Sequence, residues 1–390
     1  METTHTLDPP PNTKVDPYQD PAYNQPPAIS EIDRAESHSL TLSNSLHEAD
    51  FPLGGTPEAK LRFLLNYAIL APSNRNTQPW QWRFAGDTVE LYADLTRALP
   101  HLDPNGRELT LSCGAALLHL RLAMRHFGYR DEVKAMPAPD DPNLLAVVRL
   151  GEEAPPSAEE ELLFEAIPRR HTNRHPFQER ELPDALKSAM QQEAEREGAW
   201  LQFIEDNEAR MAIIDLIAKS DRVQGHDSQF LQETANWIRP SRAATADGIP
   251  EYALGNGGLV SHYATDLGEA LADKDRLLAW SAAALVVLET ADDTPREWLA
   301  AGQALARVLL RASAEGVQAS FLNSPVEVVE MWPQLHHVLK RAGLPQFILR
   351  LGYPAQETGP TPRRSVSEVT QPVAGDASTP PALKPPLPTI

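Results

Sequence analysis

The sequence predicts an α+β fold made of two related halves. Short strand-like runs alternate with longer helical patterns, and two of the helical patterns match. One runs from Gly114-Ala115-Ala116-Leu117 to Gly128, and the other from Gly302-Gln303-Ala304-Leu305 to Gly316, with the same spacing between glycines and Arg-Glu upstream of each. Leu/Ala-rich helices can resemble each other by chance. The shared spacing favours a remote duplication, with two glycine-containing helices crossing closely about a pseudo-twofold axis.

Composition limits the functional classes. The chain has 390 residues and a net charge of −19, which argues against nucleic acid or an anionic membrane as a partner. Its single cysteine, Cys113, excludes an intrachain disulfide and lies in an apolar helical pattern, where a small buried side chain is expected. No signal-like or membrane-spanning apolar run is present, so we expect a cytoplasmic protein.

Both ends of the sequence differ in composition from the middle. Residues 1–55 are expected to form a disordered arm, since their first fifty are rich in Pro, Ser, Asp and Asn. Residues 371–390 contain two proline pairs and are expected to form an extended tail.

The first half is expected to span residues 56–155. Thr56-Pro57 is a typical helix start, with a threonine cap and proline in the first turn. The elements expected after this helix are strands at 82–84 and 88–93 joined by Gly86-Asp87, a helix at 107–127, and strands near 133 and at 144–150. An acidic, proline-containing linker at 151–160 would end this half.

The second half is expected to span residues 156–370. Its expected elements are helices at 182–196, 207–238, 295–314 and 326–342, and strands at 200–204, 282–288, 317–322 and 347–352. Residues 240–262 include Gly255-Asn256-Gly257-Gly258, which lacks dinucleotide-binding spacing. This stretch is predicted to be either a lid over a binding site or a plain surface loop.

The segment from Pro72 to Trp80 (PSNRNTQPW) is the most unusual loop. Its prolines and side-chain amides favour a stiff turn that presents neutral donors and acceptors beside an aromatic ring. Such a loop suits a flat heterocycle with polar edges. A capped helix end followed by a buried Trp80 is an equally good interpretation of the loop alone.

The segment from Arg169 to Arg174 (RRHTNR) is the sharpest charged feature. Guanidinium groups, a hydroxyl and backbone amides together favour a phosphate or a planar anion. Arg363-Arg364, beyond the last strand, could close on the same anion. The alternative is a solvated helix start whose arginines pair with Glu165 and Glu179.

These segments carry a family resemblance. The loop, the Arg170–Arg174 motif, the segment 316–325 (GVQASFLNSP) and the segment 362–369 (PRRSVSEV) together resemble the FMN-dependent nitroreductase superfamily. In ordinary nitroreductases the arginine motif precedes the loop, whereas here the loop comes first. That order, with the Ser112–Ala116 helix, is similar to the Acg-like branch, so the resemblance implies a nitroreductase-like fold.

The resemblance also implies site residues around FMN. Arg174 would lie near flavin N1/O2, Asn323 and Ser324 near N5/O4, and Arg169, Arg170, His171, Thr172, Arg363 and Arg364 around the phosphate. The ribityl chain and pyrimidine would meet Pro72, Ser73, Asn74 and Asn76. No acid–base triad and no metal is required, because the flavin carries the redox step.

Nitroreductase homodimers bind FMN at the subunit interface, and here each half supplies only one part of such a site. We therefore expect an intrachain pseudo-dimer that binds one FMN and is a monomer. The resemblance implies hydride transfer from NAD(P)H through FMN to a nitroaromatic, quinone or similar small-molecule acceptor. The alternative is a non-enzymatic protein that sequesters or stores FMN beneath a closed lid.

Overall fold

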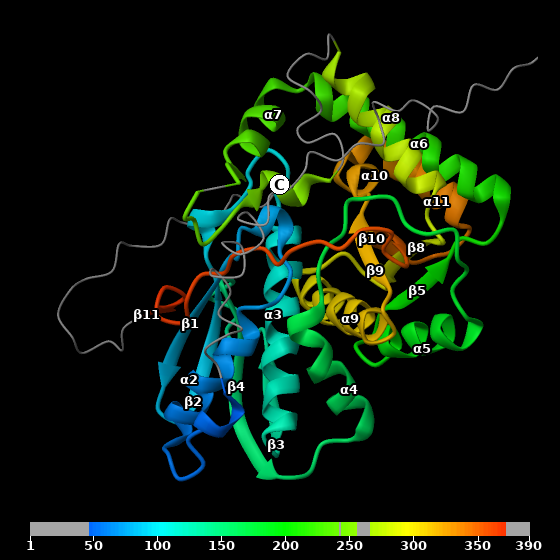
Figure 1. Cartoon of the computed structure of the whole chain (residues 1–390). Coiled ribbons are helices and arrows are strands. Elements are labelled where there is room, and N and C mark those ends of the chain that lie inside the picture. Colours follow the sequence, from blue (N-terminus) through cyan, green and yellow to red (C-terminus); the bar gives the residue numbers. More distant parts are fainter. Residues whose placement is uncertain (1–46, 242, 256–265, 372–390) are drawn as a thin grey trace, which may run out of the picture. The chain divides into compact units, whose positions relative to one another are not determined.

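The computed structural model of the chain describes residues 47–241, 243–255 and 266–371 (Figure 1). Helices and strands alternate along this part of the chain, which confirms the α+β class. Among the described residues, no helix combines the length and the apolar content that a bilayer crossing requires.

The first sheet has five strands in the order β11-β1-β2-β4-β3. Helix α2 (Pro57–Ala68) precedes the sheet, and α3 (Arg107–His126) joins its second and third strands. Its antiparallel strands are β1 (Trp80–Ala85), β2 (Thr88–Ala93), β3 (Tyr129–Ala135) and β4 (Leu144–Glu153). The fifth strand, β11 (Thr370–Gln371), comes from the far end of the described chain and pairs parallel with β1.

The second sheet has four antiparallel strands in the order β5-β8-β10-β9. These strands are β5 (Trp200–Phe203), β8 (Ala284–Thr290), β9 (Gln318–Phe321) and β10 (Leu344–Gly352). Helix α5 (Asp184–Glu195) precedes the sheet, and α9 (Pro295–Ala314) joins its second and third strands. Leaving β11 aside, both sheets therefore have the spatial order first, second, fourth, third, with one long helix at the same point.

One connection differs strongly between the two sheets. Strands β1 and β2 are joined by Gly86-Asp87, where Gly86 adopts a positive φ of 66°. Between β5 and β8 the chain instead forms an insertion, which Figure 1 shows at one end of α3. The described elements of the insertion are α6 (Asn207–His226), α7 (Ser228–Ala235), β6 (Ile238–Arg239), β7 (Ile249–Pro250), η8 (Glu251–Leu254) and α8 (Leu267–Trp280).

Helices α3 and α9 cross at two glycines. A Cβ atom on Gly114 would lie 2.3 Å from the Leu299 carbonyl oxygen, and one on Gly302 would lie 2.0 Å from the Leu111 carbonyl oxygen. Only glycine leaves room for this approach, so the predicted close crossing of the two helices is confirmed. Most of α3 is buried, including several of its polar side chains.

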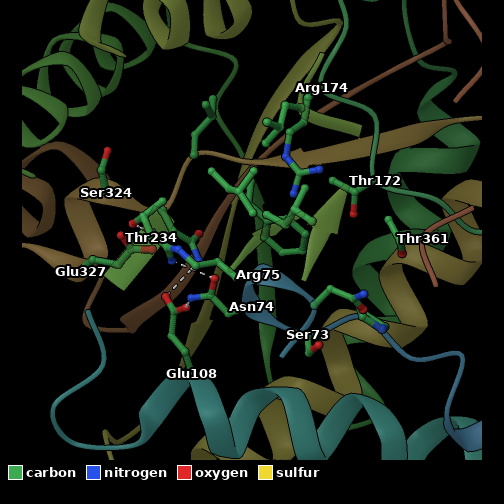
Figure 2. Close-up of a pocket in the computed structure, with 18 of the residues that line it drawn as sticks. Ser73, Asn74, Arg75, Glu108, Thr172, Arg174, Thr234, Ser324, Glu327 and Thr361 are labelled. Atoms are coloured by element: carbon green, nitrogen blue, oxygen red, sulfur yellow. Dashed lines mark hydrogen bonds between the residues drawn. The ribbon is translucent and has the colours of Figure 1, made fainter. Parts of the chain in front are cut away.

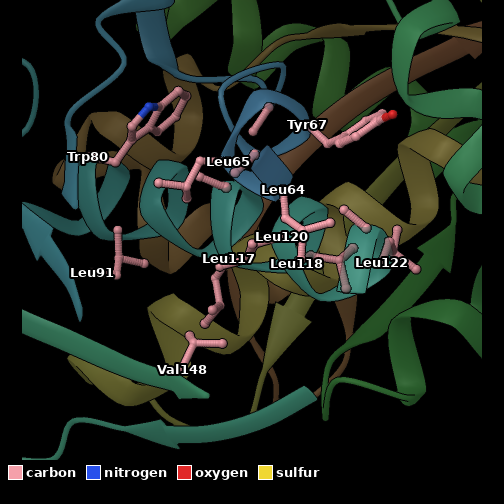
Figure 3. Packing of buried hydrophobic residues seen from close by; sticks show 14 of the residues in the cluster. Leu64, Leu65, Tyr67, Trp80, Leu91, Leu117, Leu118, Leu120, Leu122 and Val148 are labelled. Carbon is pink, nitrogen blue, oxygen red and sulfur yellow. The ribbon is translucent and has the colours of Figure 1, made fainter. Parts of the chain in front are cut away.

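The first sheet packs against α2 and α3 around a leucine-rich core (Figure 3). Trp80 and Trp82 on β1 are fully buried there, together with Leu117 and Leu120 of α3. Burying side chains of this size contributes about 1.5–3 kcal/mol each, so this core anchors the loop that ends at Trp80. Cys113 is buried in the same cluster and is a free thiol, as the sequence predicted.

Several predicted boundaries need correction. Residues 47–55 do not behave as an arm, because Phe51 is buried and stacks on Phe127 with ring centroids 4.4 Å apart. Strand β4 runs into the expected 151–160 linker, and α4 (Ala158–Ala166) starts inside it with a Ser157 capping box.

Three helical regions also differ from the prediction. The helix expected at 207–238 breaks where the Asp227 side chain caps α7, and α8 was not predicted. The helix expected at 326–342 is instead α10 (Ser324–Glu327), a short 3-10 turn and α11 (Trp332–Leu339). Residues 1–46, 242, 256–265 and 372–390 of the predicted arm, lid and tail lie outside the described residues.

Candidate functional site

A cavity of about 540 Å³ lies between α3, the loop before β1, the segment before α5 and the insertion. Its size is within the range of small-molecule and cofactor sites. Residues from widely separated parts of the chain line it, including Pro72, Ser73, Asn74, Asn76, Arg170, His171, Thr172, Arg174, Asn323, Ser324 and Arg363. The structure therefore brings together most of the residues that the sequence singled out.

The loop holds a tight, bonded conformation. Arg75, Asn76 and Gln78 have positive φ values of 47°, 55° and 50°, which non-glycine residues seldom adopt and which commonly mark functional sites. The Ser73 hydroxyl accepts a 2.9 Å hydrogen bond from the Gln78 backbone N–H. The Asn76 amide donates to the Gly248 carbonyl at 2.9 Å and to the Pro362 carbonyl at 3.0 Å. Asn76 thus ties the loop to the insertion and to the chain's last segment.

The arginine segment lies extended beside β9. The Asn173 backbone N–H donates to the Ala319 carbonyl at 2.9 Å, and Thr172 forms a parallel bridge with Ala319. In an extended segment alternate side chains share a face, which places Arg170, Thr172 and Arg174 toward the cavity. Arg174 is held by a 2.9 Å bond to the Ala253 carbonyl of the insertion.

One end of the cavity carries uncompensated positive charge. Arg170 is only 6% exposed, and its side chain has no hydrogen-bond or carboxylate partner among the described residues. Arg363 donates to the carbonyls of Leu70 and Thr361 but likewise has no described carboxylate partner. Buried charge without a counterion is costly, so these two guanidinium groups are typical of an anion site.

The pKa shifts agree with this charge distribution. Burial lowers the pKa of Arg170 to about 10, and burial together with the charge of Arg170 lowers the pKa of Arg363 to about 9. Burial and then Arg170 lower the pKa of His171 to about 4, so this imidazole is neutral near pH 7. An anion bound between the arginines would relieve their repulsion.

Two predicted phosphate ligands do not line the cavity. Arg169 is exposed as the last residue of the 3-10 turn η7 (Ile167–Arg169), and its Nε donates to the Glu165 carbonyl at 3.1 Å. Arg364 donates from its backbone to the Gln78 side chain and lies 3.8 Å from Asp94. Both arginines therefore fall outside the site.

The other end of the cavity was not foreseen. Four acidic residues line it from four different helices, Glu108 (α3), Asp221 (α6), Asp275 (α8) and Glu327 (α10). Figure 2 shows Ser324 and Glu327 on the opposite side of the cavity from Thr172 and Arg174. Because these carboxyl groups are dispersed along the sequence, no linear motif indicated them.

Asn74, Asn323 and Arg75 contact the acidic end. Asn74 and Asn323 both donate to the Glu108 carboxylate, and Asn323 also accepts a 3.0 Å bond from the Ile348 N–H. Arg75, which the sequence analysis overlooked, donates to Asn74 at 3.2 Å and to Thr234 of α7 at 2.8 Å. Arg75 therefore links the loop to the insertion.

Comparison with known proteins identifies the class. The chain is 33% identical over 323 residues to Rv3131 of Mycobacterium tuberculosis, provisionally named an NAD(P)H nitroreductase, covering 81% of this chain and 92% of that protein. The chain therefore belongs to the nitroreductase family, as the motifs predicted. It is also 29% identical to acg of the same organism, which bears a similar provisional name, over 79% of this chain and 94% of that protein.

Solved structures match more loosely. The FMN-dependent nitroreductase NfnB from Mycobacterium smegmatis, in complex with NADPH, has 17% identity and a TM-score of 0.39, covering 54% of this chain and 97% of that one. No family model matches the chain.

Proposed function

We propose that the chain binds one FMN in this cavity and passes hydride from NAD(P)H to a nitroaromatic, quinone or similar acceptor. The observation that carries the proposal is Arg170, a buried guanidinium without a described partner, beside Arg363. A phosphate monoester fits two such groups, since each can donate charge-assisted hydrogen bonds.

In this proposal each of these groups has a distinct task. Arg170, Arg363 and Thr172 hold the phosphate, and His171 lies beside them as a neutral side chain. Bound FMN would supply the hydride chemistry. Arg174 stabilises negative charge at the N1/O2 edge. Asn323 is already bonded to Glu108 and Ile348, so it orients the segment that presents Ser324 near N5/O4.

The remaining ligands of the proposed site come from the loop. Pro72, Ser73, Asn74 and Asn76 line the same cavity and would face the ribityl chain and pyrimidine. Arg169 and Arg364 have no role in this site. Proline and the bonded amides fix the loop before binding, which lowers the ordering cost of taking up the cofactor.

We also propose that the two halves form an intrachain pseudo-dimer with a single flavin site. Supporting this, both sheets share one strand order and the long helices cross at equivalent glycines. The first half supplies the loop and the second half supplies the arginines. Such a chain would need no partner subunit, so light scattering should find a monomer.

The phosphate assignment is tested by Arg170→Ala with Arg169→Ala as its matched control. Loss of charge-assisted hydrogen bonds should weaken FMN binding about 100-fold in Arg170→Ala. Arg169→Ala should bind FMN like the parent, because Arg169 faces solvent. Titration of apoprotein with FMN measures both, and equal affinities in the two variants would refute the assignment.

A second function is favoured by one observation. The insertion is tied across the cavity by Arg75–Thr234, by Arg97–Asp247, and by Glu233, which accepts bonds from the His101 and Leu102 N–H groups. An insertion held this firmly across the cavity would limit access to a bound flavin, which would suit a protein that stores FMN. Anaerobic addition of NADH or NADPH separates the two functions, because rapid flavin bleaching supports the oxidoreductase and an unreactive flavin contradicts it.

A further inference from the structure

The acidic end of the cavity contains more carboxyl groups than the proposed flavin site uses. Glu108 and Glu327 face Arg75, while Asp221 and Asp275 face Lys274. Arg174, which also lines the cavity, interacts with Asp275. Two cations outside the lining act on the same carboxyl groups, Arg107 on Glu108 and Arg350 on Asp275. Arg170 and Arg363 sit at the other end without carboxylate partners, so the two ends of the cavity differ in charge.

Asp221 is the group that indicates a ligand. It is 5% exposed and lines the cavity, and its Oδ2 atom has no hydrogen-bond partner among the described residues. Its carboxylate interacts with the Ser324 hydroxyl. A buried carboxyl oxygen without a donor costs free energy, which a bound donor would recover.

A metal ion is a poor occupant for this end. Within the described part of the chain, no three His, Cys, Asp or Glu side chains converge closely enough to hold one. The same cavity is also lined by the apolar side chains of Phe230, Leu271 and Phe321. Apolar walls beside carboxylates are typical of sites for cationic aromatic compounds.

We propose that this end is a subsite for the cationic head of an aromatic electron acceptor, either a protonated amine or a quaternised ring nitrogen. The assignment rests on the proposed flavin function, since it names the class of acceptor which that function would serve. The aromatic body would lie between the apolar side chains, with its head among Asp221, Glu327 and Glu108.

Electrostatics favours a cation here and disfavours an anion. Burial, followed by the carboxyl groups of Asp275 and Glu327, raises the pKa of Asp221 to about 8. Burial and then Glu327 raise the pKa of Glu108 as well. Asp221 therefore binds a proton near pH 7 in the free site. A cationic head would lower this pKa and favour the ionised carboxylate, which Asn cannot form, whereas an anionic substituent would raise the pKa of Asp221 further.

The test uses three nitroaromatic probes of similar size that differ in charge: 4-nitrobenzylamine, 4-nitrobenzyl alcohol and 4-nitrobenzoate. Binding to the purified oxidised protein is measured by calorimetry, after its flavin content has been read from its absorbance. The ammonium probe should bind about tenfold more tightly than the alcohol, and the carboxylate should bind most weakly. Equal affinities for all three would overturn the subsite.

Charge-neutralising variants locate the preference. Asp221→Asn and Glu327→Gln should each bring the amine-to-alcohol affinity ratio toward one. The matched controls are Asp215→Asn on the exposed face of α6 and the exposed Glu330→Gln, which should keep the parent ratio. A cation preference that survives both neutralising variants contradicts the proposal.

The two proposals fail in different ways. Protein that neither contains nor takes up FMN would refute the flavin function, whatever the probes do. Flavin-loaded protein without charge discrimination would refute only the subsite.

Discussion

The two sheets share one strand order but differ in what joins their first two strands. A two-residue turn at Gly86-Asp87 closes β1 onto β2, whereas β5 and β8 are separated by the whole insertion. One side of the cavity is therefore formed by the loop before β1 and by α3. The opposite side is formed by Arg170, Arg174 and Arg363 and by the insertion between β5 and β8. The cavity is asymmetric because only one of two similar frameworks carries the insertion.

The outer edges of the sheets differ as well. Strand β11 covers β1, while β5 is the terminal strand of its sheet among the described residues. To reach β1, the chain runs from β10 past the cavity, and Thr361 and Arg363 line the cavity along this path. The segment that links the two sheets therefore places Arg363 beside Arg170, at the positively charged end of the cavity.

The largest expected effect is at the helix crossing that the two halves share. In Gly302→Ala the new methyl group would overlap the Leu111 carbonyl, so α3 and α9 must separate. Overpacking of this kind should lower the free energy of unfolding by about 3 kcal/mol, measured by urea denaturation.

A matched control is Gly54→Ala, since a Cβ atom at Gly54 would meet no atom within 4 Å. It should unfold at the parent urea concentration. An unchanged midpoint in Gly302→Ala would show that the two helices are not as close as the structure places them.

A smaller effect is expected at Asp247, where the insertion contacts Arg97. Asp247 pairs with Arg97 and, at 3.0 Å, with Arg239. Asp247→Asn should weaken this contact and increase amide hydrogen exchange in α7 about tenfold at neutral pH. Exchange that stays at the parent rate would show that Asp247 does not stabilise the insertion.

Acid should weaken the Asp247 contact in the parent protein, as Asp247→Asn does, because it protonates the same carboxylate. Burial raises the pKa of Asp247, but hydrogen bonds from Arg97 and Arg239 outweigh burial and lower it overall. A lowered folded-state pKa stabilises the fold above the unfolded value of about 3.9, and this stabilisation is lost as pH falls through the folded pKa. Only below the folded pKa of Asp247, which lies under its ordinary value of about 3.9, should parent and Asp247→Asn therefore converge in the amide exchange of α7.

The smallest effect is expected at an exposed pair of the first sheet. Glu132 and Arg149 form an ion pair on β3 and β4, with side chains 46% and 50% exposed. Exposed pairs contribute little, so Glu132→Gln should change the free energy of unfolding by less than about 1 kcal/mol. It serves as the surface-charge control for Asp247→Asn.

The sequence predicted those parts of the fold and site that local signals specify. The Thr56-Pro57 cap, the Gly86-Asp87 turn and the two glycine-containing helices all appear where their patterns indicated. The Arg170–Arg174 motif could be found because three polar side chains that line the cavity, Arg170, Thr172 and Arg174, stand within five residues.

Features that depend on tertiary contact were not predictable. Glu108 and Asp221 line one cavity only because α3 and α6 both border it, and neither residue stands in a local motif. Arg169 looked equivalent to Arg170 in the sequence, but the turn before the extended segment points it into solvent. Phe51 followed a polar arm, and only its stacking on Phe127 shows that the folded part begins before it.

The central claim is that two similar halves build one flavin site. The most direct measurement is the stoichiometry of FMN released from denatured protein against chain concentration, checked by native mass spectrometry. The account predicts one FMN per chain in the parent and a large loss in Arg170→Ala. Two FMN per chain, or none after reconstitution with FMN, would contradict it.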